Sequence, residues 1–189
     1  MATKKKVGIK VPTKNEILKK YGSMIIQASD TKEPGLWLPS TFFNLNYTLG
    51  GGFPWGKVTE IAGEESSGKS LIALNAAYAC QQLGGSVIWV DAEQSWMNSW
   101  AELNGIDPNK VTVIRDTRIE YISDAVADVA IYLRSKLVNN EPILLVVDSV
   151  AAIDCSDNID SKMVDGKAEM GGRAKALYRY FRIRSVLFY

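Results

Sequence analysis

The stretch Gly63-Glu64-Glu65-Ser66-Ser67-Gly68-Lys69-Ser70 decides how this sequence folds, because it has the pattern Gly-x-x-x-x-Gly-Lys-Ser. This pattern is typical of a loop that joins a strand to a helix and binds phosphate. In such a loop, backbone N–H groups and the N-terminus of the next helix point toward one small volume, where their dipoles hold phosphate oxygens. A simple Gly/Ser turn is the alternative, but an apolar run before the loop and a helix-compatible run after it favour the phosphate loop.

The residue types at the end of the loop predict how it treats a nucleotide. Gly63 and Gly68 permit a close approach that a Cβ would block. Lys69 is expected to reach the β- and γ-phosphates and to assist catalysis, while the Ser70 hydroxyl is expected to bind Mg²⁺. We therefore predict ATP and Mg²⁺ as cofactors, with the whole stretch in contact with ATP: Gly63, Glu64, Glu65, Ser66, Ser67, Gly68, Lys69 and Ser70.

Outward from this loop, strand-like and helix-like runs alternate, which predicts an α/β fold with a mainly parallel sheet flanked by helices. The predicted strands are 58–62, 86–90, 111–115 and 143–147, and the predicted helices are 69–83, 96–103, 119–138 and one from about 174. The continuously apolar run 143–147 is typical of a central strand buried on both faces. Thr117-x-x-Glu120 has the spacing of a capping box for the helix that follows.

The N-terminal part has a different character. Thr13-x-x-Glu16 also has capping-box spacing, and it predicts a short helix that ends near Tyr21. Gly and Pro then mark a connector. We expect residues 1–45 to form a helix and connector for subunit packing, and residues 46–189 to form the nucleotide-binding core.

Acidic residues follow two of the predicted strands. Because the carboxyl ends of parallel strands meet at one edge of a sheet, Asp148 is expected near Ser70 as a second Mg²⁺ ligand. Glu93 is expected at the same edge, where its carboxylate could activate the water that attacks the γ-phosphate, and Asp91 is expected to point to the same side. The alternatives are a strand-end turn for Asp148 and a solvated acid for Glu93.

Two further patterns leave alternatives open. Trp96 and Trp100 lie one helical turn apart, a spacing found more often in a core than in a ligand platform.

Beyond residue 160 the sequence is basic, and Lys175, Arg179 and Arg182 recur at i, i+4 and i+7 after a Gly-containing stretch. This stripe suits binding to a phosphate backbone, but a solvated face or a subunit contact is an equal alternative.

The composition argues against histidine-dependent catalysis, a membrane-spanning helix and a secretory signal peptide. The 189 residues carry a net charge of +1 and no histidine, so acid–base chemistry falls to carboxylates or water. No apolar run is long enough to span a bilayer, and no signal peptide follows the lysine-rich start. Two isolated cysteines indicate a reducing cytoplasm. We also expect no membrane partner, since no long apolar run is present.

Taken together, the motifs resemble those of the RecA-type strand-exchange recombinases. These motifs are Leu49-Gly50-Gly51-Gly52-Phe53-Pro54, the loop 63–70, Val90-Asp91-Ala92-Glu93, Val146-Val147-Asp148-Ser149-Val150-Ala151-Ala152 and Met170-Gly171. The sequence between these motifs resembles phage UvsX-like members more than bacterial housekeeping members of the family. This resemblance would place the protein in the cytoplasm of a host cell.

The resemblance implies an ATP-dependent recombinase that forms a helical homo-oligomeric filament on single-stranded DNA and pairs it with duplex DNA, in recombination and repair. It makes Glu93 the catalytic base and Trp100 an adenine-stacking residue, and it implies that the N-terminal helix packs on a neighbouring protomer. The implied DNA-binding residues are Lys167, Met170, Gly171, Arg173, Lys175, Arg179 and Arg182.

The sequence also departs from the family. Gly172 and Arg173 replace residues that are usually apolar or small, and the sequence stops in an apolar helical run, so we expect a RecA-like core that is incomplete at its C-terminus. Two other functions therefore stay open. One is a hexameric helicase or related DNA motor with the same core, and the other is a nucleotide-gated assembly module without turnover.

Overall fold

The computed structural model describes residues 12–25, 28–30, 36–138 and 141–156. The chain divides into two compact units, 1–35 and 36–189. The predicted last helix and the whole basic segment lie outside the described residues. In the part of the chain that is described, no helix combines the length and apolar character needed to cross a membrane.

The first unit contains the predicted short helix. Helix α1 spans Lys14–Tyr21 and is followed by two 3₁₀ turns, Gly22–Met24 and Ala28–Asp30. The Thr13 hydroxyl accepts a hydrogen bond from the Glu16 N–H, and the Glu16 carboxylate accepts one from the Thr13 N–H at 2.8 Å. This reciprocal pair is the predicted capping box, and it satisfies two backbone donors that a helix start otherwise leaves unpaired.

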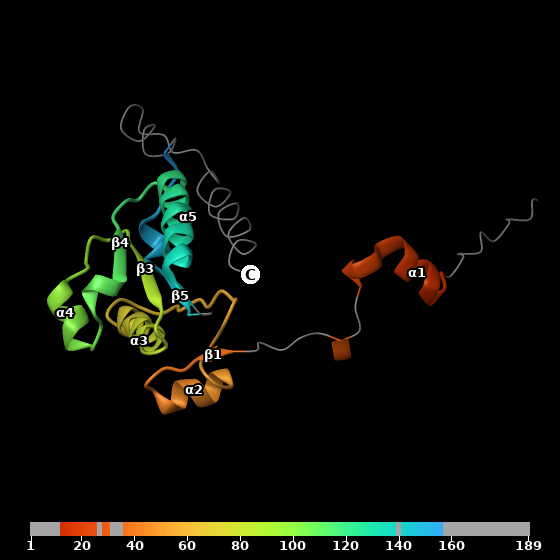
Figure 1. Cartoon of the computed structure of the whole chain (residues 1–189), viewed down its shortest axis with the longest axis horizontal. Coiled ribbons are helices and arrows are strands. Elements are labelled where there is room, and N and C mark those ends of the chain that lie inside the picture. The colour runs from red at the N-terminus through yellow and green to blue at the C-terminus, as the bar shows by residue number, and fades with distance from the viewer. Residues whose placement is uncertain (1–11, 26–27, 31–35, 139–140, 157–189) are drawn as a thin grey trace, which may run out of the picture. The chain divides into compact units, whose positions relative to one another are not determined.

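A three-stranded parallel sheet forms the centre of the second unit, in the order β4-β3-β5. Its strands are β3 (Ser86–Asp91), β4 (Val111–Ile114) and β5 (Ile143–Asp148). In the register, Asp91 at the end of β3 lies opposite Asp148 at the end of β5. The predicted α/β class with a parallel sheet is thereby confirmed (Figure 1).

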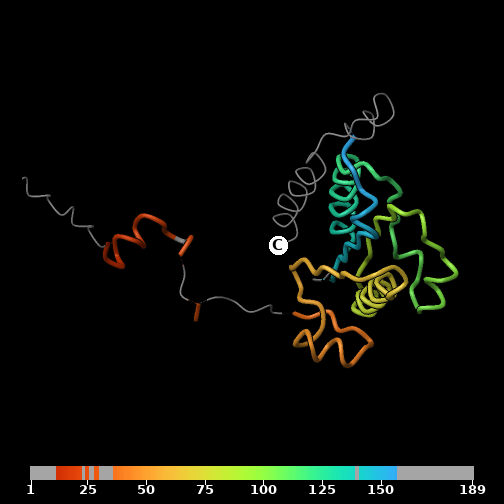
Figure 2. Tube along the Cα trace, turned by 180° about the vertical axis from the view of Figure 1, so that it is seen from behind, coloured from red at the N-terminus to blue at the C-terminus, as the bar shows by residue number. Residues whose placement is uncertain are grey.

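Two helices cover opposite faces of this sheet, because side chains along β3 alternate between them. Val87 and Trp89 pack in a core cluster with α3 (Lys69–Gln82), whereas Ile88 and Val90 pack in a second cluster with α5 (Ile119–Lys136). Figure 2 shows the same arrangement from behind. The sheet and its two helices form the rigid base from which the strand-end loops project.

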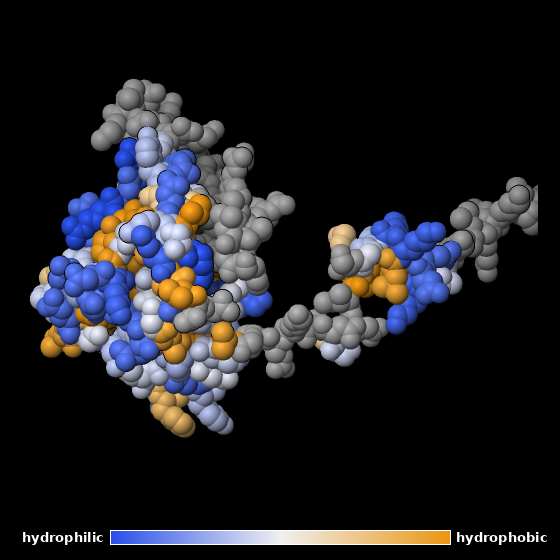
Figure 3. All heavy atoms as spheres, viewed as in Figure 1, coloured by the Kyte–Doolittle hydropathy of each residue, from blue (hydrophilic) through white to orange (hydrophobic). Residues whose placement is uncertain are grey.

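Smaller elements complete the unit. The two-residue strands β1 (Trp37–Leu38) and β2 (Phe53–Pro54) pair antiparallel, and helix α2 (Phe43–Leu49) lies between them in the sequence. Helix α4 (Asn98–Leu103) and a 3₁₀ turn at Pro108–Lys110 join β3 to β4, and a further 3₁₀ turn at Val150–Ala152 follows β5. Phe43 of α2 is 78% exposed, consistent with the hydrophobic side chains at the surface over α2 (Figure 3).

Three local predictions were wrong. Residues 58–62 form no strand, and Val58 is 71% exposed, because no described strand offers this segment backbone hydrogen bonds. The run 143–147 was predicted to be a buried central strand. Among the described strands, however, β3 is central and β5 lies at an edge. The residues of β5 are half-buried, because helices cover both of its faces while only one strand adjoins it. Arg118, not Thr117, is the N-cap of α5, and the Thr117 carbonyl accepts a hydrogen bond from the Asp154 N–H instead.

Candidate phosphate and magnesium site

The predicted phosphate loop leads directly into α3. Gly68 is the N-cap of this helix, with φ at +92°, and no side chain caps the helix start. A Cβ at Gly63 would lie 2.6 Å from the Ser67 hydroxyl, so the loop closes tightly only around glycine. The first N–H groups of α3 therefore point out of the helix without a side-chain cap, which is the arrangement that binds anions.

Lys69, the first residue of α3, folds back into the loop. Its Nζ donates hydrogen bonds to the carbonyl of Gly63 at 3.0 Å and to the carbonyl of Glu64 at 2.6 Å. The ammonium group thus lies beside the backbone that would surround a phosphate. A bound anion would be a stronger partner for this cation than two neutral carbonyl groups are.

Ser70 and Asp148 come together as the sequence predicts. The Ser70 hydroxyl donates to Oδ2 of Asp148 at 2.8 Å, which joins the start of α3 to the end of β5 across 78 residues. No three Cys, Asp or Glu side chains cluster as a metal site within the described ranges. Mg²⁺ suits this smaller donor set, because it usually takes one or two protein oxygens and completes its shell with phosphate and water. Ser70 and Asp148 therefore fit the predicted ion.

Glu93 lies at the same edge of the sheet and contacts the residue next to Asp148. Its Oε1 accepts a hydrogen bond of 2.5 Å from the hydroxyl of Ser149. The Asp148–Ser149 peptide bond is cis. The structure thus brings together Ser70, Asp148, Ser149 and Glu93 through two hydrogen bonds and one peptide link. The pattern of strand-end acids predicted Asp148 and Glu93, but it gave no role to Ser149.

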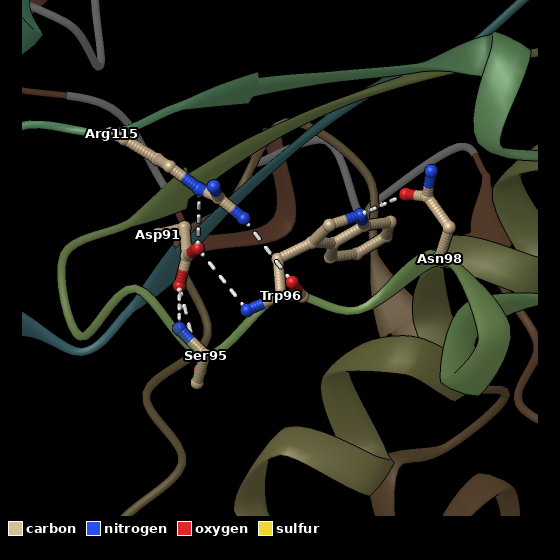
Figure 4. A network of polar contacts seen from close by, with 5 residues as sticks. All are labelled: Asp91, Ser95, Trp96, Asn98 and Arg115. Carbon is tan, nitrogen blue, oxygen red and sulfur yellow. Dashed lines mark hydrogen bonds and ion pairs between the residues drawn. The ribbon is translucent and has the colours of Figure 1, made fainter.

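Asp91 does not share the environment of Glu93, which corrects the prediction that both point to the same side. Asp91 is fully buried, and its carboxylate binds Ser95, Trp96 and Arg115 (Figure 4). The reason is that β3 ends at Asp91 and the chain then turns, with Gln94 at a φ of +55°. The alternation of a strand cannot be extended through such a turn.

The two tryptophans also separate. Helix α4 begins at Asn98, two residues after Trp96, so the pair does not share a helix face as the spacing suggested. Trp96 packs beside Trp89, with ring centroids 5.0 Å apart. Trp100 lies on α4 and is 38% exposed. An adenine-stacking role for Trp100 stays a prediction.

The predicted DNA-binding residues are outside the described residues. They are Lys167, Met170, Gly171, Arg173, Lys175, Arg179 and Arg182. Within the described part, the contact of Arg115 with Asp91 is one that the sequence reasoning missed. Arg115 directly follows β4, and its place at a strand end beside Asp91 was the available signal.

The fold and the strand-end residues define a class: an α/β core with the glycine-containing loop 63–70 before α3 and a carboxylate after a parallel strand, an arrangement typical of nucleotide-binding proteins. Comparison with known proteins then narrows this class. The family model of the RecA N-terminal domain matches residues 10–185. The chain belongs to the RecA family.

Individual relatives agree with this assignment. The chain is 36% identical to Protein RecA of Malacoplasma penetrans, over 89% of this chain and 48% of the relative. It is 32% identical to Protein RecA of Nitratidesulfovibrio vulgaris, over 88% and 45%, and 30% identical to Protein RecA of Bacteroides thetaiotaomicron, over 92% and 51%. The chain therefore spans about half the length of the curated relatives that it matches.

Proposed function

We propose that this chain contains the ATP-binding core of a DNA recombinase, which forms a filament on single-stranded DNA and exchanges strands with duplex DNA in the cytoplasm. The observation that carries the proposal is the hydrogen bond from Ser70 to Asp148 at the uncapped start of α3. It places a hydroxyl and a carboxylate beside a phosphate loop, in a chain of the RecA family. A nucleotide with its magnesium ion is the ligand that this combination fits.

The residues of the site divide the work of ATP turnover. ATP, when bound with Mg²⁺, supplies the phosphoryl group and the metal charge. The loop 63–68 and the first turn of α3 would bind phosphate oxygens through backbone N–H groups, and Lys69 would exchange its two carbonyl partners for phosphate. Ser70 and Asp148 would hold the ion, while Glu93 would accept a proton from the attacking water and Trp100 would stack on the adenine.

Binding to DNA and assembly into a filament are further parts of the proposal, and they rest on membership of the family. The basic segment beyond residue 160 supports them by its charge, because Lys and Arg residues release counterions when they contact phosphates. The charge-removing pair of substitutions Lys175→Ala and Arg182→Ala should reduce the slope of log affinity against log salt by roughly one unit per lost phosphate contact. An unchanged slope would assign this segment to a solvated face or a subunit contact.

The test of the ATP site compares two substitutions. Lys69→Ala should abolish binding of a fluorescent ATP analogue, whereas Glu93→Gln should keep its affinity within about twofold and lose turnover by roughly a hundredfold or more, because only proton transfer to Glu93 is affected. Lys110→Ala, which removes a lysine from the 3₁₀ turn before β4, is the matched control for loss of charge.

Equal loss of binding in Lys69→Ala and Glu93→Gln would contradict the role of Glu93. Binding of ATP by the unmodified chain without any turnover, with and without single-stranded DNA, would instead favour the nucleotide-gated assembly module. A closed ring seen by electron microscopy, in place of an open helix on DNA, would favour the hexameric motor.

A further inference from the structure

A buried carboxylate at the end of β3 organises the loop that follows it. Asp91 has no exposed surface, and its two oxygens accept hydrogen bonds from four donors. Oδ1 accepts from the N–H of Ser95 at 2.8 Å and from its hydroxyl at 3.4 Å, and Oδ2 accepts from the N–H of Trp96 at 3.1 Å and from Nε of Arg115 at 3.2 Å. A buried charge is tolerated when it is paired and hydrogen-bonded in this way.

Arg115 connects the same loop to the neighbouring strand. It directly follows β4, and its side chain is 54% exposed, so the guanidinium lies between solvent and the buried carboxylate. Besides its contact with Asp91, its NH2 group donates to the carbonyl of Trp96 at 3.2 Å. The backbone of Trp96 is therefore held twice, at its N–H by Asp91 and at its carbonyl by Arg115 (Figure 4).

The loop between these anchors carries the predicted catalytic carboxylate. Ala92 is buried, but Glu93, Gln94 and Ser95 are exposed, so this short stretch lacks a packed interior of its own. Within the loop, the Ala92 N–H donates to the Asp148 carbonyl and Glu93 accepts from Ser149, and the loop is otherwise held where its two ends are attached. A displacement of about 1 Å in a reacting group can reduce a rate by roughly a hundredfold, so the attachment of the loop has a direct bearing on turnover.

We propose that Asp91 and Arg115 form a two-point clamp that positions Glu93, and that Arg115 is a positioning residue for ATP turnover without touching the nucleotide. This inference rests on the proposed function for its catalytic part. The planar guanidinium suits the task, since one nitrogen can bind the carboxylate while another binds the Trp96 carbonyl. The clamp also positions the start of α4, because Trp96 lies two residues before that helix.

The first experiment measures the clamp in the nucleotide-free chain by amide hydrogen exchange in a peptide covering residues 92–97. Arg115→Ala should raise exchange in this peptide about tenfold, because the Trp96 carbonyl loses its partner and Asp91 loses its cation. Arg134→Ala is the matched control. Arg134 of α5 likewise donates to a backbone carbonyl, that of Glu141 at 3.1 Å, but it lies outside this network.

The second experiment measures consequences for the site. Arg115→Ala should bind a fluorescent ATP analogue within about twofold of the unmodified chain, while kcat falls roughly tenfold or more. Arg115→Lys keeps the charge but loses the planar fork, and it should recover less than half of each change. Adding Arg115→Ala to Glu93→Gln should reduce turnover no further, because the carboxylate to be positioned is already absent.

The outcomes separate the clamp from the proposed function. Unchanged exchange in Arg115→Ala, or full recovery by Arg115→Lys, would overturn the clamp. Raised exchange with unchanged kcat would overturn its positioning role. Absence of turnover in the unmodified chain would overturn the enzymatic part of the proposed function, and hydrogen exchange alone would then decide whether Arg115 holds the loop.

Discussion

At the scale of single residues, the positions of the loop before α3 and of Asp148 and Glu93 after the strands could be predicted because each is a local pattern. Asp148 meets Ser70 where two elements with fixed directions must meet, at the carboxyl edge of a parallel sheet. Ser149 and Arg115 could not be assigned in the same way. Their partners, Glu93 and Asp91, are 56 and 24 residues away, and nothing in either local pattern specifies the pairing.

A residue-scale prediction concerns the buried thiol of Cys80 on α3. Burial raises the pKa of the Cys80 thiol from 9.0 to about 12, and a backbone hydrogen bond from Leu144 lowers this pKa by a smaller amount. In the unfolded chain this thiol ionises near pH 9, whereas in the folded chain it stays protonated. Its contribution to stability is therefore complete below pH 9 and is lost as the pH rises toward 12.

This loss should amount to about 1.4 kcal/mol per pH unit above pH 9, from this group alone. Urea unfolding of the unmodified chain, Cys80→Ala and Cys80→Val at pH 8, 9, 10 and 10.5 measures it. Both variants should show a shallower decline of unfolding free energy with pH, whatever their absolute stability. Parallel declines in all three proteins would show that the thiol does not set this pH dependence.

At the scale of elements, the parts that depend on local periodicity matched the structure best. Helix α3, strand β3 and the capped helix α1 lie within a few residues of their predicted bounds. The segment 58–62 failed because a strand needs a neighbour for its hydrogen bonds, and a local pattern cannot supply one. The predicted central position of β5 was wrong for a related reason. Among the described strands β5 lies at an edge, because apolar residues on both faces require covering helices but not two adjacent strands.

Helix α1 should depend strongly on its N-terminal cap. No residue of this helix is buried, so its cap should contribute a large part of its stability. Thr13→Ala removes the hydroxyl that accepts from Glu16, and it should cost about 1 kcal/mol of helix stability. Hydrogen exchange over residues 14–21 measures this loss. Lys14→Ala, at the first helical position, is the control, and equal exchange in the two variants would argue against the capping box.

At the scale of the whole molecule, the two compact units should respond differently to a ligand. The phosphate loop, Ser70 and Asp148 all belong to the unit 36–189. A ligand that binds only the folded state adds stability to the unit that holds its site, about 2.7 kcal/mol at a concentration of 100 times its Kd. ATP with Mg²⁺ should therefore slow hydrogen exchange in α3, β3 and β5, but not in α1.

Removal of the metal tests whether the protection by ATP depends on Mg²⁺. EDTA should abolish most of the protection, because Ser70 and Asp148 would lose the ion that links them to the phosphates. Asp148→Asn should reproduce the effect of EDTA in the presence of Mg²⁺, since the amide has lost the charge that binds the cation. Lys69→Ala should prevent protection under every condition. Protection that persists undiminished in EDTA and in Asp148→Asn would mean that the nucleotide is held without a metal at this edge of the sheet.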